Sequence, residues 1–340
     1  MAYKIYDLGD FALESGQVLP KATLAYEVYG QLNSRRDNAV LLCSAITATH
    51  EGNNFLIGEG RCFDPKRFFI VSTNQFANGL SSSPSNTPAP LDGPRFPGIK
   101  IRDNVRAQSL LVQNELRISK LAMVAGFSMG AQQAFQWAVS YPDAVERVAA
   151  WCGHAHTTAY THAFIDGMAR VLEDAVDWNG GDYKEPPVIG LRAQARAYAG
   201  WGMSPSWYRA SLWKKLGFDT AEHFMVGYWE QFFCRLEANN FLSQIETWKS
   251  HNVGATPGFG GDYRKALASV QARTLVMPCA TDLYFSAADA EEEASYIPNA
   301  TVKTIPSVWG HWAGFGTDEA DSAFINATIA KFLSDHPARR

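Results

Sequence analysis

One stretch, residues 121–137, limits the fold of this chain more than any other. It reads L-A-M-V-A-G-F-S-M-G-A-Q-Q-A-F-Q-W: an apolar, strand-like run, a glycine-flanked turn, and a stretch with helical spacing. A strand, a G-x-S-x-G turn and a helix predict a nucleophilic serine at the turn, here Ser128. Gly126 and Gly130 leave room where a Cβ would collide with the neighbouring strand or helix. The backbone N–H of Met129, at the start of the helix, would face a developing oxyanion.

The turn resembles the nucleophile elbow of the α/β-hydrolase fold, where an acid and then a histidine follow the serine along the chain. The strand-like run at 274–279 leads to Asp282, and the later loop Val308-Trp-Gly-His311 supplies a histidine. We therefore predict a catalytic triad in which His311 takes the Ser128 proton. Asp282 would fix the histidine tautomer and stabilise its cation. Asp289 is the alternative acid, but it lies within a predicted helix.

The second oxyanion donor is expected in the loop after the third strand. The apolar run at 38–44 is typical of a buried parallel strand. Ser44-Ala-Ile-Thr-Ala-Thr-His50 follows it, and Ile46 N–H is the candidate by position. Thr47 is a candidate for substrate binding. A further apolar strand at 145–152 ends at Gly153-His154-Ala-His156.

The pattern of elements predicts an α/β protein with a mostly parallel sheet flanked by helices. We predict that residues 1–156 and 269–340 form the core and that 157–268 form an inserted helical lid. Helical patterns dominate the insertion, which also carries Trp201, Trp207, Trp213, Trp229 and Trp248. The polar, proline-rich segment at 74–97 is too long for an ordinary loop, so we expect it to be functional or mobile.

Composition excludes several function classes. A net charge of −4 with no basic stripe argues against nucleic-acid binding. The start of the chain lacks the apolar region of a signal peptide, and no apolar run reaches the length of a membrane span. The five cysteines are widely spaced, which favours free thiols in a reducing cytoplasm.

His154 and His156 could form half of a metal site, but no third ligand has a recognisable spacing. We therefore expect no metal and no cofactor, and place His154 near the substrate cavity.

Several blocks in order resemble the homoserine O-acetyltransferase family of the α/β-hydrolase fold. Leu24-Ala-Tyr-Glu-Val-Tyr-Gly-Gln-Leu-Asn33 is similar to its I-A-Y-E-T-Y-G-x-L-N opening. The other matching blocks are Phe96–Asp103 with Val105–Gln108, Glu237–Leu242, Thr281–Phe285 and Gly310-His311. The resemblance implies the triad Ser128, Asp282 and His311, and the oxyanion donors Met129 and Ile46. It also implies a helical lid, through which members of that family often dimerise.

The departures from this family concern recognition rather than chemistry. The acetyltransferases have His-Ala-Leu-Thr-Gly where this chain has Ser44–Ala48, and Gly-Gly-Met where it has Gly130-Ala131-Gln132. The glycines of their Asn-x-x-Gly-Gly-x-x-Gly-Ser loop are mostly lost at 74–82. An aspartate that binds the substrate ammonium follows their catalytic histidine, and here the residue is Trp312. A neutral indole cannot replace that carboxylate in an ion pair.

Two functions compete most closely. The first is a serine hydrolase that cleaves a small ester or amide through an acyl-serine intermediate. The alternative is an acetyl-CoA-dependent O-acyltransferase that acts on an alcohol other than homoserine. Both form acyl-Ser128 and differ in whether water or an alcohol takes the acyl group. A non-catalytic binding protein and a hydrolase of carbon–carbon bonds are less favoured. The loss of the ammonium-binding aspartate favours the hydrolase, with a small-molecule acyl substrate bound in part by Trp312.

Overall fold

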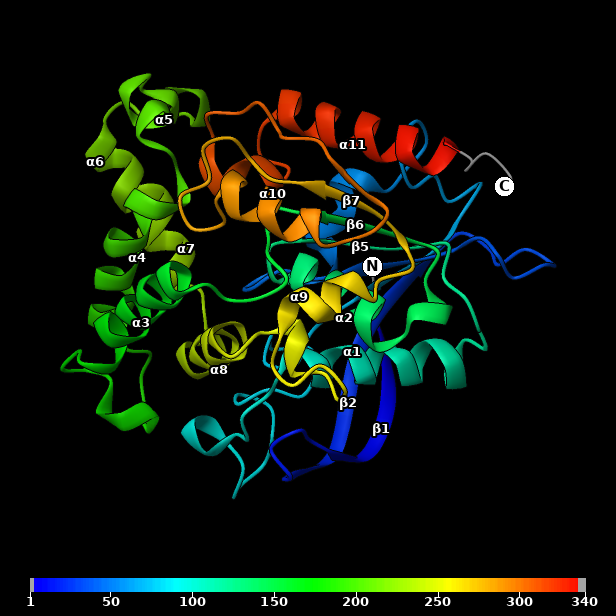
Figure 1. The fold of residues 1–340 in the computed structure, drawn as a ribbon. Coiled ribbons are helices and arrows are strands. Elements are labelled where there is room, and N and C mark those ends of the chain that lie inside the picture. Colours follow the sequence, from blue (N-terminus) through cyan, green and yellow to red (C-terminus); the bar gives the residue numbers. More distant parts are fainter. Residues whose placement is uncertain (1–2, 336–340) are drawn as a thin grey trace.

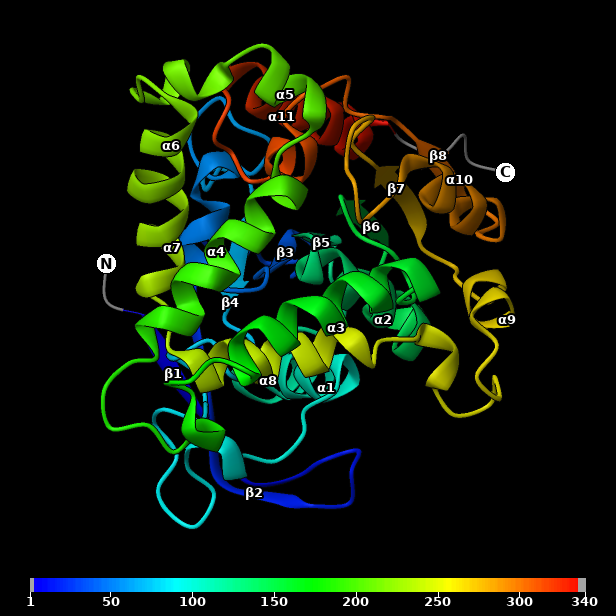
Figure 2. The ribbon, with the colours of Figure 1, turned by 90° about the vertical axis from the view of Figure 1, so that its left-hand side faces the viewer.

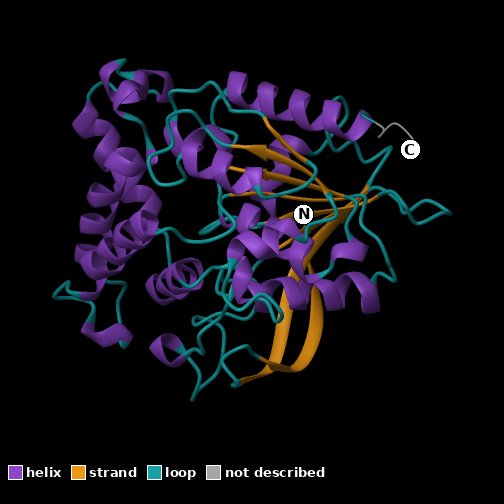
Figure 3. Ribbon diagram, in the orientation of Figure 1, coloured by secondary structure: helices purple, strands orange, loops and turns teal. Residues whose placement is uncertain are grey.

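The computed structural model describes residues 3–335 and places one eight-stranded sheet at the centre of the protein (Figure 3). The spatial order of the strands is β1-β2-β4-β3-β5-β6-β7-β8. The pairs β1–β2 and β2–β4 are antiparallel, and the strands from β4 to β8 run parallel. The prediction of an α/β protein with a mostly parallel sheet is confirmed. The strands are β1 (Lys4–Ala12), β2 (Val18–Tyr29), β3 (Ala39–Cys43), β4 (Phe69–Thr73), β5 (Met123–Phe127), β6 (Arg147–Trp151), β7 (Arg273–Met277) and β8 (Ala300–Val302).

The central strands are buried along their whole length because helices cover both faces of the sheet. All residues of β3 (AVLLC) and β5 (MVAGF) are buried, which explains their continuous apolar runs. Figure 1 shows α1 and α2 on one side of the sheet and α11 on the other. The helices are α1 (Ile101–Leu110), α2 (Met129–Ser140), α3 (Ala159–Glu173), α4 (Val188–Gly202), α5 (Pro205–Arg209), α6 (Ala221–Phe224), α7 (Gln231–Cys234), α8 (Ala238–Lys249), α9 (Tyr263–Ala268), α10 (Ala287–Ser295) and α11 (Glu319–Ser334).

Helices α3 to α8 are inserted between β6 and β7 and stand at one side of the sheet (Figures 1 and 2). The π-helical stretch η7 (Met225–Glu230) joins α6 and α7 into one continuous helix. The fully buried indoles of Trp207 and Trp229 lie within this insertion, where large aromatic surfaces supply much of the packing energy. Helix α9 packs against the short helix η8 (Val253–Ala255) and against α10. The exact lid boundaries, 157 and 268, stay a prediction.

The long segment at 74–97 is neither extended nor loosely attached. Asn74, Gln75, Ser81 and Ser83 are fully buried. Their side chains hold the loop from within, for example through Ser81 Oγ, which donates to the Asn74 carbonyl at 2.9 Å. Local side-chain hydrogen bonds of this kind replace regular secondary structure.

Two further predictions can be placed against the described residues. No helix within residues 3–335 is long and apolar enough to cross a membrane. Residues 1–2 and 336–340, which the predicted core includes, lie outside the part of the chain that the structure describes.

Candidate active site

Ser128 lies at a sharp turn between β5 and α2, with φ 57° and ψ −121°. The two flanking glycines make the turn sterically feasible. A Cβ on Gly126 would lie at 2.3 Å from the Gly130 carbonyl carbon, and a Cβ on Gly130 would lie 2.6 Å from the Cys43 oxygen. A strained turn between strand and helix holds a serine hydroxyl clear of its own backbone. The glycine pattern predicted from the sequence has this steric origin.

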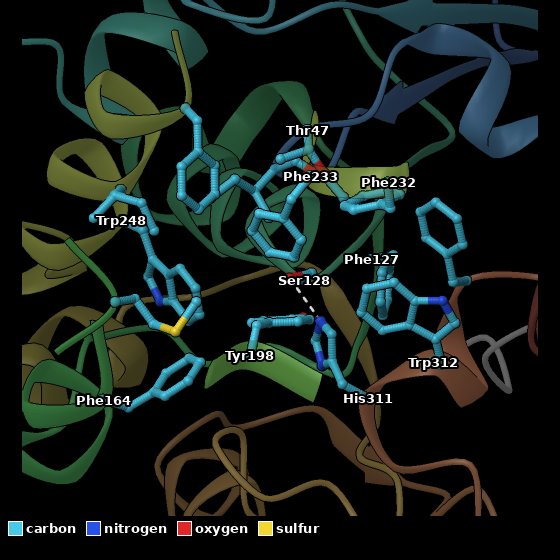
Figure 4. A pocket seen from close by; sticks show the side chains of 16 residues that line it. Thr47, Phe127, Ser128, Phe164, Tyr198, Phe232, Phe233, Trp248, His311 and Trp312 are labelled. Carbon is cyan, nitrogen blue, oxygen red and sulfur yellow. Dashed lines mark hydrogen bonds between the residues drawn. The ribbon is translucent and has the colours of Figure 1, made fainter. Parts of the chain in front are cut away.

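The structure brings Ser128, His311 and Asp282 together at the carboxyl end of the sheet. Figure 4 shows the hydrogen bond between Ser128 and His311. Ser128 Oγ lies 3.0 Å from His311 Nε2, and His311 Nδ1 lies 2.7 Å from Asp282 Oδ2. All three residues are buried. Hydrogen-bonded in this order, they can pass the serine proton to the imidazole while the carboxylate stabilises the resulting cation.

Backbone groups fix the orientation of the Asp282 carboxylate. Its other oxygen, Oδ1, accepts hydrogen bonds from the N–H groups of Tyr284 at 3.2 Å and Phe285 at 3.1 Å. The alternative acid, Asp289, lies in α10, where its N–H is capped by Ser286 Oγ. The geometry favours Asp282, because only its carboxylate bonds to the histidine within the described residues.

A polar network that the sequence analysis missed connects the acid loop to the histidine loop. Thr281 Oγ1 donates to the Ser307 carbonyl at 2.8 Å and accepts from Gly310 N–H at 3.1 Å. Ser307 Oγ donates to Asp321 Oδ2 at 2.6 Å. Burial raises the pKa of Asp321. These bonds hold the residues next to Asp282 and His311 at a fixed separation.

Of the two candidate oxyanion donors, Met129 is the first residue of α2, directly after the turn at Ser128, and Ile46 lies in the loop that follows β3. Pairing of Gly126 with Cys43 sets β5 beside β3, so that the loop after β3 faces the turn after β5. Within residues 3–335, no protein group accepts a hydrogen bond from the N–H of Met129 or of Ile46. Both N–H groups are therefore available to a ligand.

An apolar cavity opens at Ser128 (Figure 4). Its volume is about 30 Å³, which leaves room for one or two water molecules. Phenylalanine, tryptophan and aliphatic side chains make most of its wall. The lining residues are Ala45, Ile46, Thr47, Phe127, Ser128, Phe164, Met168, Tyr198, Phe232, Phe233, Phe241, Ile245, Trp248, His311, Trp312 and Phe315.

Trp312 and Thr47 line this cavity, and their role in substrate binding stays a prediction. The Trp312 indole donates from Nε1 to Tyr228 Oη at 2.6 Å and packs against Trp229, with ring centroids 4.8 Å apart. No acidic or basic side chain other than His311 is among the described residues that line the cavity. A neutral ligand suits such a wall better than a charged one, because a charge buried without a partner is strongly disfavoured.

His154, predicted to bind substrate, does not line the cavity, and its role in substrate binding stays a prediction. His154 is fully buried and is absent from the described residues that line the cavity. Its Nε2 lies 3.1 Å from the Ser286 carbonyl, and its ring packs edge-on against Phe285. His156 instead bonds through Nδ1 to Glu293 at 2.5 Å. Among the described residues, no group of three or more His, Cys, Asp or Glu side chains is placed so that it could hold a metal ion.

Tyr198, which lines the cavity, and the buried Tyr284 connect the insertion to the core. Tyr198 of α4 and Tyr284 of the acid loop share a hydrogen bond of 2.7 Å between their hydroxyl groups. Burial raises the pKa of both phenols, so both stay uncharged at neutral pH. The pair joins the insertion directly to the segment that carries Asp282. Its members are far apart in sequence, and no spacing pattern signals it.

The fold and the site are those of an α/β hydrolase. The model of the alpha/beta hydrolase fold family matches residues 38–316, and the chain belongs to this family. Within it, the chain is 35% identical to the ethyl acetate hydrolase of Pseudomonas veronii, over 98% of this chain and 95% of the relative. The solved structure of the acetyl esterase MekB has a TM-score of 0.96 at 35% identity and covers 98% of this chain and 97% of its own.

The homoserine O-acetyltransferase of Nostoc punctiforme is 31% identical, over 88% of each chain. The chain is thus a divergent member of the homoserine O-acetyltransferase-like group, as the sequence blocks predicted. Its similarity to esterases confirms the prediction of an enzyme of the serine hydrolase type.

Proposed function

We propose that this serine hydrolase cleaves esters between a short acyl group and a small uncharged alcohol. Ser128 is the nucleophile, His311 the general base and acid, and Asp282 the residue that orients the histidine. The observation that carries the proposal is the ordered Ser128–His311–Asp282 chain facing a small, uncharged cavity. Relatives named ethyl acetate hydrolase and acetyl esterase support an acetyl ester as the substrate.

In the first half-reaction Ser128 Oγ attacks the ester carbonyl carbon while His311 Nε2 takes the serine proton. The carbonyl oxygen becomes an oxyanion, which the N–H groups of Met129 and Ile46 stabilise. The carbon–oxygen bond to the alcohol then breaks. His311 gives its proton to the leaving alkoxide, and acyl-Ser128 remains.

In the second half-reaction a water attacks the acyl carbon, and His311 Nε2 takes one of its protons. The tetrahedral intermediate collapses, the carboxylic acid leaves, and the proton on His311 returns to Ser128 Oγ. The sum is an ester plus water giving an acid plus an alcohol, with the enzyme regenerated.

The shape of the cavity favours esters with short acyl groups. The phenyl rings and indoles of the wall exclude charged ends and leave little free volume beside Ser128. Trp312 occupies the position at which the acetyltransferases carry an ammonium-binding aspartate, so that an amino-acid alcohol lacks its ion-pair partner here. Esters with longer acyl chains should therefore react more slowly than acetyl esters.

Acyl transfer to an alcohol is the second candidate, favoured by the 31% identity to homoserine O-acetyltransferases. The two reactions share the acyl-enzyme and differ in the acceptor. Incubation with ethyl acetate, and separately with acetyl-CoA plus homoserine, distinguishes them by product. We expect acetate and ethanol from the first mixture and little O-acetylhomoserine from the second. Rapid, Ser128-dependent O-acetylhomoserine formation with no ester cleavage would reverse the assignment.

We also propose that the insertion acts as a lid and carries a homodimer interface. Val176 and Ile189, which are 88% and 60% exposed, and the neighbouring Val188 leave apolar side chains uncovered on it. The three are close in space, because Ile189 N–H donates to Asp177 at 2.7 Å. Light scattering after gel filtration should give a dimer for the wild type and a monomer for Ile189→Asp. A cytoplasmic location stays a prediction.

A further inference from the structure

Three glutamines far apart in sequence hold the loop at 44–48, which we call the oxyanion loop. Gln133 Nε2 donates to the Ser44 carbonyl at 2.9 Å, and Gln75 Nε2 donates to the Ala45 carbonyl at 2.8 Å. Gln244 Oε1 accepts from Thr47 N–H at 2.7 Å. These glutamine side chains are at most 2% exposed. Amides buried this deeply need hydrogen-bond partners, and the loop backbone provides them.

Gln75 fixes the peptide plane that carries the proposed oxyanion donor. In a trans peptide the carbonyl and the following N–H point in opposite directions. The Ala45 carbonyl belongs to the same plane as Ile46 N–H, and it also accepts from Ala48 N–H at 3.3 Å. The donor cannot rotate away from Ser128 without breaking both bonds to the Ala45 oxygen.

Gln244 fixes the next peptide plane, at a residue with an unfavourable backbone conformation. Thr47 has φ 58°, a left-handed conformation that β-branched residues rarely adopt. Such a conformation persists where the surroundings determine it fully. Here Gln244 Oε1 holds the Thr47 N–H while its Nε2 donates to the Ala77 carbonyl at 2.8 Å. Thr47 Oγ1 bonds to the Ile46 carbonyl at 2.7 Å.

We propose that Gln75 and Gln244 are positioning residues that aim Ile46 N–H at the oxyanion of the transition state. The proposal rests on the proposed function, in which Ile46 is one of the two donors. Gln244 belongs to α8 of the insertion, so one helix of the predicted lid acts directly on the chemistry and not only on access. A donor of this kind works when it is fixed before the charge develops, and a displaced donor loses most of its effect.

The test compares Gln75→Met and Gln244→Met with Gln136→Met as a matched control. Methionine has nearly the shape of glutamine and cannot make these hydrogen bonds. Gln136 is also buried, but its side chain donates to Ser140 Oγ at 2.7 Å and to Thr256 Oγ1 at 2.8 Å and makes no bond to the oxyanion loop. It does not line the cavity, so Gln136→Met should keep wild-type activity and measures the effect of losing a buried glutamine as such.

With ethyl acetate as the substrate, we expect each positioning variant to lower kcat by about 10- to 100-fold, part of the 10²–10³ effect of a whole donor. KM should change by less than about threefold, because the oxyanion exists only in the transition state. The affinity for a trifluoromethyl ketone, which adds to Ser128 as an oxyanion, should fall in parallel with kcat/KM. The double variant should lose less than the product of the single losses, since both residues act through one N–H.

Several outcomes would overturn the proposal. One is a kcat within about threefold of wild type in both variants, with unchanged circular dichroism. Another is a rise in KM alone, which would make the glutamines part of substrate binding. If the methionine variants do not fold, Gln75→Asn and Gln244→Asn withdraw the amide by one methylene, and the same split between kcat and KM decides. If wild type cleaves neither ethyl acetate nor p-nitrophenyl acetate, the proposed function itself fails. If wild type is active and Ser128→Ala is inactive, the proposed function holds, and the glutamine variants test the positioning role alone.

Discussion

Replacement of Asp282 by asparagine should disable the enzyme through the histidine tautomer rather than through the fold. The two oxygens of the Asp282 carboxylate have different hydrogen-bond partners. Oδ1 accepts from the N–H groups of Tyr284 and Phe285, and Oδ2 accepts from His311 Nδ1 at 2.7 Å. An asparagine must place its oxygen toward the two backbone donors, because its NH₂ group cannot accept from them. The NH₂ group then faces His311 Nδ1.

The magnitude follows from this forced orientation. Facing an NH₂ donor, Nδ1 becomes the acceptor, and the proton moves to Nε2, which lies 3.0 Å from Ser128 Oγ. A protonated Nε2 cannot take the serine proton. The loss of kcat from the wrong tautomer is about 10⁴-fold, or about 5.4 kcal/mol of activation free energy at 1.36 kcal/mol per factor of ten. KM should remain close to wild type, since Asp282 does not line the cavity.

The assay is release of acid from ethyl acetate at constant pH, with the melting temperature measured in parallel. Asp289→Asn is the matched control, because Asp289 is also close in sequence and makes no bond to His311. We expect Asp289→Asn to keep normal turnover. A near-normal kcat in Asp282→Asn, or a collapse in Asp289→Asn, would refute the assignment of the acid. A melting temperature so low that Asp282→Asn is unfolded in the assay would refute the tautomer argument, because unfolding would then explain the lost activity.

The remaining predictions concern the nucleophile, the elbow and the specificity. Ser128→Ala should lower turnover by about 10⁶-fold with the fold intact, and mass spectrometry should find a serine-reactive phosphonate on Ser128 of wild type and nowhere else. Gly130→Ala would place a Cβ 2.6 Å from the Cys43 oxygen, so thermal unfolding should show destabilisation of about 1–3 kcal/mol from overpacking; an unchanged melting temperature would contradict the steric argument. Wild type should transfer little acetyl from acetyl-CoA to homoserine, and Trp312→Asp should improve this by at most about 10- to 150-fold, the value of one charge-assisted hydrogen bond. Efficient wild-type transfer in that steady-state assay would restore the acyltransferase reading.

The sequence was sufficient to predict the parts of the site that depend on local geometry. Ser128 stands between two glycines at a strand-to-helix turn, and Asp282 and His311 follow late strands in the expected order. In a parallel sheet, residues that follow strands in this way gather at one edge. Strand order alone was therefore enough to predict that Ser128, Asp282 and His311 lie at the same edge of the sheet.

The direction in which a side chain points could not be predicted in this way. His154 follows β6 at the correct edge, yet its ring turns toward Phe285 and the Ser286 carbonyl. The chain bends just before it, at Cys152, where φ is 47°. Strand order assigns the edge, and the backbone bend decides which residues face the cavity.

The polar contacts that fix the oxyanion loop escaped prediction for another reason. Gln75, Gln133 and Gln244 come from a loop, from α2 and from α8, and no common spacing connects them. A buried glutamine in a sequence looks like any other polar residue until its partner is known. Hydrogen bonds between elements far apart in sequence are a property of the tertiary fold.

Separation of chemistry from recognition explains how one framework can serve both hydrolysis and acyl transfer. The reacting groups stand on core loops after β5, β7 and β8 and are held by backbone and buried polar contacts. We expect recognition to depend on the aromatic side chains that line the cavity, mainly from the insertion, and on Trp312, the residue directly after the histidine. A change of acceptor from an alcohol to water then requires no new catalytic group. Once the alcohol has left, the acceptor site needs only room for one water near His311 Nε2. The same aromatic wall gives an amino-acid acceptor no ion-pair partner, which favours water as the acceptor.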